Sequence, residues 1–516
     1  MLDIEKVTDI EVLRQVARLQ QQTIEHLQKR LAEMKRELAK LQGKSDAQLQ
    51  LEIKLLEEQL NRMRQQMYGA SSERSDRDNT AAEKKKSPQS GHGPRPQPQL
   101  PVVERTHELD EADKVCPKCG GQLVEWEGQF EESEEIDYVQ CEYRIVRHKR
   151  KKYRCQCQSC IETALGPPKL ILGGRYSIDF AAHAATAKYG DVLPLSRQVG
   201  MMKRRGLVTD EQTLFDQIYA LLNHLRPSLA AIEKYVLAAE VVYADETRWP
   251  VLGKGKTKQW WAWSAACEDA VIYKTHPERS TEAAKNLLGD YSGIVMCDGY
   301  SVYGSLKKEL PGQFTLAHCF AHARRKFVEA QPNYPEAEKA LELIGGLYCA
   351  EHQARNWLRE FLIQKYDGDS PRVLTAEEKN LFYQYRLYLR QFWSKRLLAQ
   401  LWEYLHDLHP LPKSLLGKAC GYALDYRQGL TRFVDDARIE IDNNLVEREM
   451  RPVALGRKNY YGSRSKRGTE MAAAFYSLIE TAKLCGVDPE YYLSQAARRA
   501  IENPGTATLP HDLLSR

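Results

Sequence analysis

Two aspartates and one glutamate are the residues of this chain best suited to chemistry. Asp245 lies near the end of the apolar run AEVVYADET, and Asp298 lies near the end of GIVMCDGYSVY. Glu447 lies in DARIEIDNNLVEREMRPVALGRKNYYGS, where asparagines and basic residues surround it. Carboxylates that end strands beside basic residues are what two-metal phosphoryl transfer on nucleic acid requires. We therefore expect these three carboxylates to bind Mg²⁺ or Mn²⁺, which oxygen ligands favour over zinc.

Basic residues near these carboxylates could bind the phosphates of a nucleic acid backbone. Taken singly, each is more typical of a solvated surface charge, but together they form a cluster. The candidates for phosphate binding are Arg448, Arg451, Arg457, Lys458, Arg324 and Arg325. His318 and His322 lie with the last two in AHCFAHARRKF, and all four could line the same cleft. For either histidine taken singly, a core or structural role is the simpler interpretation.

Other acidic residues compete for the same roles. Glu246 follows Asp245 directly, so in a strand its side chain points to the opposite face. On a helix through NNLVEREM, Glu447 shares a face with Asn443 and Asn444, whereas Glu449 points away from that face. Glu440 and Asp442 are further competitors. The pattern favours Glu447.

Closely spaced cysteines form a second candidate metal site. Cys116 and Cys119 lie in VCPKCGGQL, and Cys157 and Cys160 lie in YRCQCQSC. Two such pairs can supply four thiolates to a tetrahedral structural Zn²⁺. Cys155 is an alternative ligand to Cys157. Free thiols in a small β module are the simpler alternative.

Length and composition limit the class of protein. A chain of 516 residues is expected to form two to four domains. The sequence has no apolar run of about 18 residues, the length needed to span a bilayer, so no membrane partner is expected. We expect a cytoplasmic protein, associated with the nucleoid when it binds DNA. The formal net charge of +5 is mild, but basic residues are concentrated in RIVRHKRKKYR and after Glu447.

The N-terminal region has apolar residues at heptad spacing, which predicts a coiled coil that joins copies of the chain. A single amphipathic helix packed on its own chain is the alternative. The apolar positions are Ala17, Ile24, Leu27, Leu31, Met34, Leu38 and Leu41, followed by Leu49, Ile53, Leu56, Leu60, Met63 and Met67. The Ser-, Lys-, Gln- and Pro-rich stretch that follows predicts a linker.

The middle of the chain predicts a helical region followed by strands. SRQVGMMKRRGLVTDEQTLFDQIYALLNHL predicts two helices separated by a turn at 206–209. This pair could be a DNA-reading helix-turn-helix or a bundle that braces the next domain. Three strands, a helix and a fourth strand then follow, the order of a ribonuclease-H-like mixed sheet. Adjacency of its first and fourth strands would bring Asp245 and Asp298 together.

Glu447 lies 447 − 298 = 149 residues after Asp298, which is too far for adjacent elements unless a folded module is inserted. The predicted fold is therefore a multidomain α+β protein with a ribonuclease-H-like core and a helical insertion. We expect a coiled coil at 1–69, a disordered linker at 70–104, a zinc-finger-like module at 105–175, a helical domain at 176–238, a catalytic domain at 239–470 with its insertion at about 331–434, and a C-terminal helical segment and tail at 471–516.

At these residues the sequence resembles the transposases of the insertion sequence 66 family, bacterial mobile-element proteins with a DDE catalytic triad. The similarity covers nearly the whole chain. Its most specific parts are ADETRWPVL, DGYSVYGSL, HCFAHARRKF, EIDNNLVEREMRPVALGRKNYYGSRSKRG and AAAFYSLIETAKLCGVDPEYYL. The sequence departs from the family pattern at CQCQSC, where a simple CxxC is usual, and at NYYGS, which is shorter than expected.

The resemblance implies that Asp245, Asp298 and Glu447 are the triad of a DNA transposase. Such an enzyme binds double-stranded DNA at terminal inverted repeats, cuts there and joins the freed 3′-hydroxyls to target DNA. The resemblance also suggests accessory proteins of the same element. Two alternatives remain open: a catalytically silent DNA-binding relative, and a metal-dependent nuclease without strand transfer.

Overall fold

The computed structural model describes residues 29, 143–154, 161–253, 255–366 and 374–514. From Tyr143 onward the described residues belong to one compact unit. The predicted coiled coil, apart from Lys29, and the predicted linker lie outside the described residues. No helix in the described part of the chain is long and apolar enough to cross a bilayer.

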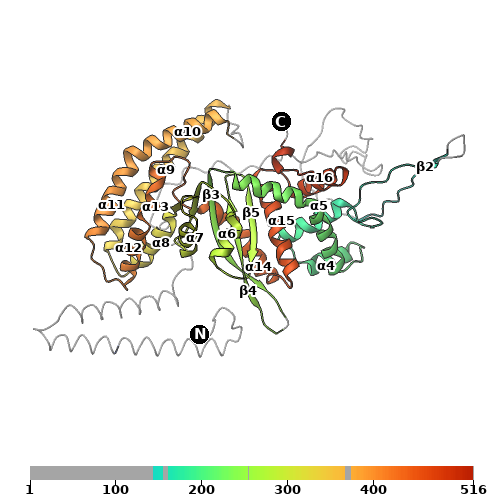
Figure 1. The fold of residues 1–516 in the computed structure, drawn as a ribbon, viewed down its shortest axis with the longest axis horizontal. Helices are drawn as coiled ribbons and strands as arrows, with labels where there is room; N and C mark the ends of the chain where they lie inside the picture. Colours follow the sequence, from blue (N-terminus) through green and yellow to red (C-terminus); the bar gives the residue numbers. More distant parts are fainter. Residues whose placement is uncertain (1–28, 30–142, 155–160, 254, 367–373, 515–516) are drawn as a thin grey trace, which may run out of the picture. The chain divides into compact units, whose positions relative to one another are not determined.

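A five-stranded mixed sheet lies at the centre of the described unit (Figure 1). Its strands have the order β5-β4-β3-β6-β7. β3 pairs antiparallel with β4 and parallel with β6, and β6 pairs parallel with β7. The strands are β3 (Val241–Val251), β4 (Lys258–Ala266), β5 (Val271–His276), β6 (Ile294–Cys297) and β7 (Thr315–His318). The predicted strands and the adjacency of the first and fourth are therefore confirmed.

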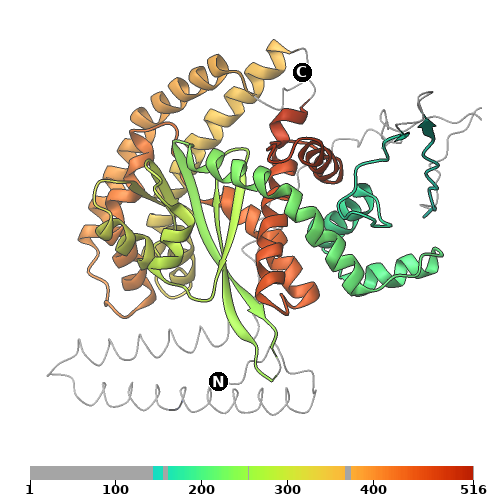
Figure 2. The ribbon, with the colours of Figure 1, turned by 45° about the vertical axis from the view of Figure 1, so that its right-hand side comes forward.

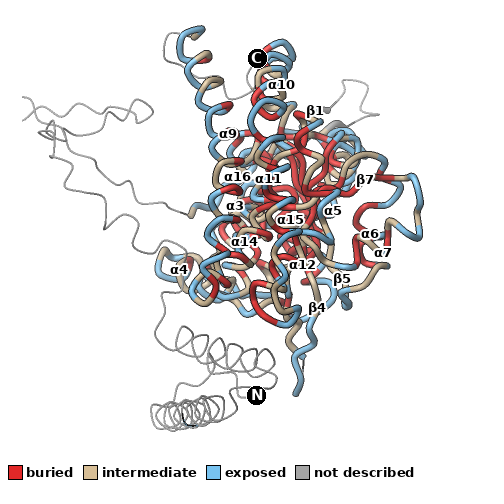
Figure 3. Tube along the Cα trace, turned by 90° about the vertical axis from the view of Figure 1, so that its left-hand side faces the viewer, coloured by how far each residue is buried: buried red, intermediate tan, exposed pale blue. Residues whose placement is uncertain are grey.

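Helices cover both faces of the sheet. α14 (Asn444–Tyr460) packs on β3, and α15 (Lys466–Leu484) packs on β5. α6 (Thr281–Leu288) packs on β4 and β5, and α7 (Ser301–Glu309) packs on α6 and β7. Figure 2 shows β3 and β4 continuing together beyond the other strands. The buried residues concentrate around the sheet and these helices (Figure 3).

α15 runs across the boundary that the sequence suggested at 470/471. Residues Met471–Ala482 of this helix are buried on all sides. The Ser477 and Thr481 hydroxyls accept hydrogen bonds from the backbone N–H groups of Tyr273 and Val271 on β5, at 2.8 and 3.1 Å. These side chains satisfy donors at the sheet edge, so α15 belongs with the sheet.

The helices before the sheet brace it. Gly206, with φ of 83°, lies in the turn between α4 and α5, as the sequence predicted for this region. α5 contacts β5, α15 and α16, and α3 contacts α16 and α5. The helices are α3 (Ile178–Tyr189), α4 (Leu195–Arg204), α5 (Glu211–Leu237) and, at the C-terminal end, α16 (Pro489–Glu502). The contacts of α5 with β5 agree with the interpretation that this helical region braces the next domain. Binding of DNA by this region stays a prediction.

The segment between β7 and α14 is helical in its described part. Its first helix, α8 (Phe320–Ala330), packs on α9 and α12. The segment continues with α9 (Glu336–Lys365), α10 (Ala376–Leu389), the π-helix η3 (Arg390–Ser394), α11 (Lys395–Asp407), α12 (Leu415–Asp425), α13 (Arg427–Thr431) and the 3-10 helix η4 (Arg432–Val434). These helices separate Asp298 from Glu447 along the chain, as the predicted insertion required.

The C-terminal 3-10 helix η5 (Pro510–Leu513) is held to the sheet by an ion pair. His511 Nε2 lies 3.0 Å from Asp269 Oδ2, and the Tyr235 hydroxyl donates to the same oxygen at 2.9 Å. The hydrogen bond with Asp269 is the main cause that raises the pKa of His511 to about 10. The folded protein therefore holds the His511 proton more tightly than the unfolded chain does.

This pKa shift predicts a pH-dependent contribution of His511 to stability. The contribution is complete below the unfolded pKa of about 6.5 and is lost as the pH rises toward 10, because the folded protein then loses the proton as well. We expect the melting temperature of wild type to exceed that of His511→Gln most at about pH 6.5 and just below it. The gap should close by about pH 10. His409→Gln, at an exposed residue, is the matched control; a gap independent of pH would contradict the prediction.

Candidate active site

Asp245 and Asp298 lie on neighbouring strands at the same level of the sheet. The parallel register pairs Tyr243 of β3 with Met296 of β6, and each aspartate lies two residues beyond its member of that pair. Asp245 Oδ1 accepts from the Glu246 N–H, and Asp298 Oδ1 accepts from the Tyr300 N–H, both at 2.9 Å. The local backbone therefore orients both carboxylates.

Asn443 fastens the start of α14 to the strand that carries Asp245. It precedes the helix but makes no side-chain cap bond. Its Nδ2 instead donates to the carbonyl oxygen of Ala244 at 3.0 Å, and its backbone N–H donates to Cys319 Sγ at 3.1 Å. The Phe320 N–H donates to Ile441 O at 3.0 Å. These bonds bring the N-terminal ends of α14 and α8 against β3, and place Glu447 in the first turn of α14 near Asp245.

Glu447 and His322 face each other in the first turns of these two helices. His322 Nδ1 lies 3.7 Å from Glu447 Oε1. Both atoms are buried, and neither has a hydrogen-bond partner. Cys319 Sγ, His322 and Glu447 each offer an atom within 4.8 Å of the others. The sequence left two interpretations of His322 open, a residue that lines the cleft and a core or structural residue, and the structure places its ring beside Glu447.

The electric field of the other carboxylates acts on Asp245. Burial is the largest cause that raises the pKa of Asp245 to about 8, and Glu246, Asp298 and Glu447 raise it further. All three candidate carboxylates are therefore within electrostatic reach of one another. Negative charges held this close are stabilised by a cation among them.

The competing acidic residues are engaged elsewhere. Glu246 points to the opposite face of β3, where Arg279 Nε and the Tyr303 hydroxyl each donate to it at 2.9 Å. Burial, and next the nearby Glu480 carboxylate on α15, raise the pKa of Glu449 to about 6. The strand and helix geometry thus separates Glu246 and Glu449 from Glu447.

Asp442 and Glu440 also have partners of their own. Asp442 Oδ1 accepts from the Asn444 N–H at 3.1 Å, and its Oδ2 accepts from Asn444 Nδ2 at 2.7 Å. Glu440 pairs with Arg386 and, at 3.2 Å, with Arg355. Both carboxylates hold the loop before α14 in place.

The basic residues proposed from the sequence fall into two groups. Arg448, Arg451 and Lys458 are exposed on α14, and Arg325 is exposed on α8. Arg457 Nη1 donates to Thr247 Oγ1 at 2.9 Å and to the Arg248 carbonyl oxygen. Arg457 therefore fastens α14 to β3. The four exposed residues, Arg448, Arg451, Lys458 and Arg325, are available to bind phosphates.

Arg324 lies on α8 and His318 is the last residue of β7, and phosphate binding by Arg324 stays a prediction. Arg324 is half-buried on α8. Burial raises the pKa of the Tyr348 hydroxyl, and the charge of Arg324 offsets part of that increase. The His318 ring lies 4.5 Å from the Tyr426 ring, between ring centres. His318 is half-buried, and burial lowers its pKa to about 4.

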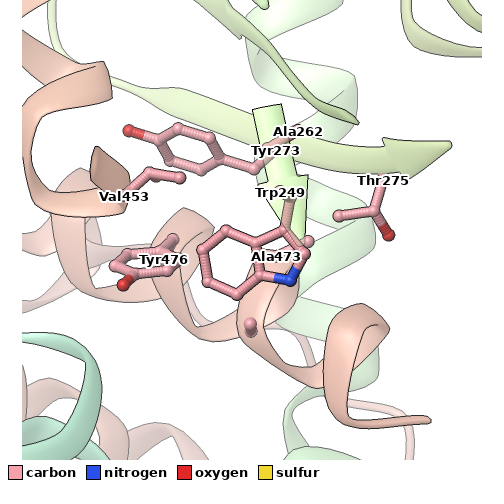
Figure 4. Close-up of a pocket in the computed structure, with 8 residues that line it drawn as sticks. Trp249, Ala262, Tyr273, Thr275, Val453, Ala473 and Tyr476 are labelled. Carbon is pink, nitrogen blue, oxygen red and sulfur yellow. The ribbon is translucent and has the colours of Figure 1, made fainter. Parts of the chain in front are cut away.

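Figure 4 shows a small, mostly apolar cavity between the sheet and α14 and α15. Trp249, Tyr273 and Tyr476 provide its aromatic wall. None of the three candidate carboxylates lines it. The cavity belongs to the packing of α14 and α15 on the sheet. The candidate chemistry lies elsewhere: Asp298 directly follows β6, as predicted, whereas Asp245 does not end its strand, because β3 continues to Val251 in its pairing with β4.

The cysteines proposed to bind zinc lie outside the described residues: Cys116, Cys119, Cys155, Cys157 and Cys160. The strands that flank the second group are described. β1 (Lys152–Arg154) pairs antiparallel with β2 (Ile161–Thr163), with Arg154 opposite Ile161. This hairpin brings the two ends of segment 155–160 together, and the choice between Cys155 and Cys157 stays open.

Comparison with known proteins identifies the chain's relatives. Residues 173–471 match the family model described as "Transposase IS66 family", and residues 113–158 match the "zinc-finger binding domain of transposase IS66". Three uncharacterized proteins of Sinorhizobium fredii are similar. The protein y4jD is 30% identical over 79% of this chain and 78% of its own length, y4qI is 31% identical over 77% and 72%, and y4hP is 28% identical over 78% and 74%. The first family match includes Asp245, Asp298 and Glu447 and covers more than half of the chain, which therefore belongs to the insertion sequence 66 family of transposases.

Proposed function

We propose that this transposase cuts DNA at the terminal inverted repeats of its element and joins the freed 3′-hydroxyls to target DNA. The observation that carries the proposal is the placement of Asp245 and Asp298 at one level of adjacent parallel strands, with Glu447 brought beside them by Asn443. The sheet order, with the first strand central and the fourth beside it, supports a ribonuclease-H-like core.

The residues at this site fit divalent cations. The donors are carboxylate oxygens, which Mg²⁺ and Mn²⁺ prefer. Glu447 Oε1 is buried without a partner, a state that costs free energy unless a cation or donor compensates it. Asp245, Asp298 and Glu447 would hold two such ions. When bound, such a pair activates the attacking hydroxyl and stabilises the leaving oxygen.

The protein's own residues would position the DNA. Arg448, Arg451 and Lys458 on α14 and Arg325 on α8 can bind backbone phosphates, because each is exposed on a helix that begins at the site. The N-terminal ends of both helices also favour negative charge. In this proposal the basic residues fix the phosphodiester against the carboxylates, and the zinc-finger module and helical region add contacts to specific sequence. The N-terminal heptads would join the copies that bind the two ends.

The test is incubation of the full chain with labelled DNA that carries the element's own ends, in Mg²⁺ and in EDTA. Joined product that requires Mg²⁺, and that Asp245→Asn does not form, is the expected result. Cutting without joining would replace the proposal with a nuclease. Binding without cutting would leave a silent DNA-binding relative, or a chain that needs accessory proteins of its element, and added extracts from cells carrying the element distinguish those two.

A further inference from the structure

His322 and Glu447 present two unpartnered polar atoms to each other inside the candidate site. Their separation of 3.7 Å is too long for a hydrogen bond, yet both atoms are buried. Buried polar atoms without partners are rare because each costs free energy. Two such atoms facing each other indicate that a bound ion or molecule belongs between them.

A cation accounts for this arrangement. Imidazole nitrogens and carboxylate oxygens bind metal ions at about 2.0–2.2 Å, so two ligands of one ion lie about 3–4 Å apart. The observed 3.7 Å lies in that range. His322 is held in the first turn of α8, whose start is bonded to Ile441 in the loop before α14. The two ligand atoms are therefore positioned by the same contacts that position the triad.

Cys319 is the third possible ligand in this cluster, but its geometry assigns it a structural role. Its Sγ accepts the Asn443 N–H at 3.1 Å and is fully buried. A thiolate would also select zinc over Mg²⁺ or Mn²⁺. His322 is thus the nitrogen donor that remains for the ion bound by Glu447.

We propose that His322 is a metal ligand of the candidate active site and binds the same divalent cation as Glu447. The proposal rests on the proposed function, because it places His322 at the metal centre of that reaction. A nitrogen ligand favours Mn²⁺ over Mg²⁺ at this position. The position with His322 should therefore bind Mn²⁺ more tightly than a position made of carboxylates alone.

The experiment is electron spin echo spectroscopy of Mn²⁺ bound to the purified full chain, because it detects nitrogen bonded directly to Mn²⁺. We expect a directly bound ¹⁴N signal in wild type and in His352→Ala, an exposed histidine of α9, and no such signal in His322→Ala. Mn²⁺ affinity at this position should fall at least about tenfold in His322→Ala. The wild-type spectrum decides the question even if a variant folds poorly.

The outcomes separate this proposal from the one on which it rests. If Mn²⁺ binding is lost in Asp245→Asn and Glu447→Gln but the wild-type spectrum shows no nitrogen signal, the role of His322 is overturned and the triad is supported. A nitrogen signal that persists in His322→Ala would also overturn it. If substitution of each of the three carboxylates leaves Mn²⁺ binding unchanged, the proposed metal site itself is wrong.

Discussion

Glu447→Gln is expected to abolish DNA cutting and joining while sparing binding to the element ends. The substitution keeps the size of the side chain but removes its negative charge and replaces one of its two oxygens with an NH₂ group, which cannot bind a cation. We expect the rate of cleavage to fall at least about a thousandfold, roughly 4 kcal/mol at 1.36 kcal/mol per decade. DNA binding should persist, because Arg448 and Arg451 are unchanged and exposed. Single-turnover cleavage and a gel-shift assay measure the two effects.

Glu449→Gln is the matched control for this prediction. It makes the same chemical change two residues away on α14, where the side chain lies near Glu480. The helix turns by about 100° per residue, so this position points away from the site. We expect Glu449→Gln to cut DNA at a rate close to wild type. If Glu447→Gln still cuts in Mg²⁺, or if both variants fail equally, the assignment of Glu447 is wrong.

The strands could be predicted from the sequence because their determinants are local, although β3 continues beyond Asp245, where the sequence placed its end. The first four residues of β3, most of β4 and all of β6 are apolar runs, and such runs predict buried strands. The opposite orientations of Asp245 and Glu246 follow from the two-residue period of a strand. These features needed no knowledge of distant residues.

The contacts that place Glu447 could not be predicted from the sequence. Asn443 bonds to Ala244 and to Cys319, which are 199 and 124 residues away along the chain. An asparagine before a helix predicts a cap, whereas here its side chain reaches a strand carbonyl. The contact of His322 with Glu447 could not be predicted for the same reason, because the two residues lie on different helices, α8 and α14. The sequence signal available was the spacing of Cys319 and His322, which puts both at the start of one helix.

A buried cluster of charges in the helical insertion was also invisible in the sequence. Glu351 of α9 accepts hydrogen bonds from Arg386 of α10 at 2.7 and 2.9 Å and from Arg390 of η3 at 2.7 and 2.9 Å. All three side chains are almost fully buried. Arg390 also donates to Phe433 O at 2.7 Å, and Arg386 pairs with Glu440. The cluster thus ties the insertion to the loop that leads into α14.

Glu351→Gln is expected to destabilise the protein strongly. Burial alone would raise the pKa of Glu351, but hydrogen bonds from Arg390 and the charges of Arg390 and Arg386 outweigh it and hold that pKa below its ordinary value. Glu351 is therefore ionised in the folded protein. Replacing it leaves two buried guanidinium groups: Arg386 keeps its pair with Glu440, whereas Arg390 loses the carboxylate of its described ion pair.

Removal of one partner from a buried ion pair costs about 3–5 kcal/mol, because the remaining charge is buried without compensation. We expect a loss of that order, measured as the shift of the denaturant midpoint followed by circular dichroism. Glu360→Gln makes the same change at an exposed position of the same helix and should shift stability by less than about 0.5 kcal/mol. Since Arg386 and Arg390 hold the loop before α14, DNA cleavage by Glu351→Gln should also fall at temperatures below its unfolding transition. Equal stability of the two variants would show that water or a rearranged Glu440 compensates the arginines, and that the insertion does not fix Glu447 through this cluster.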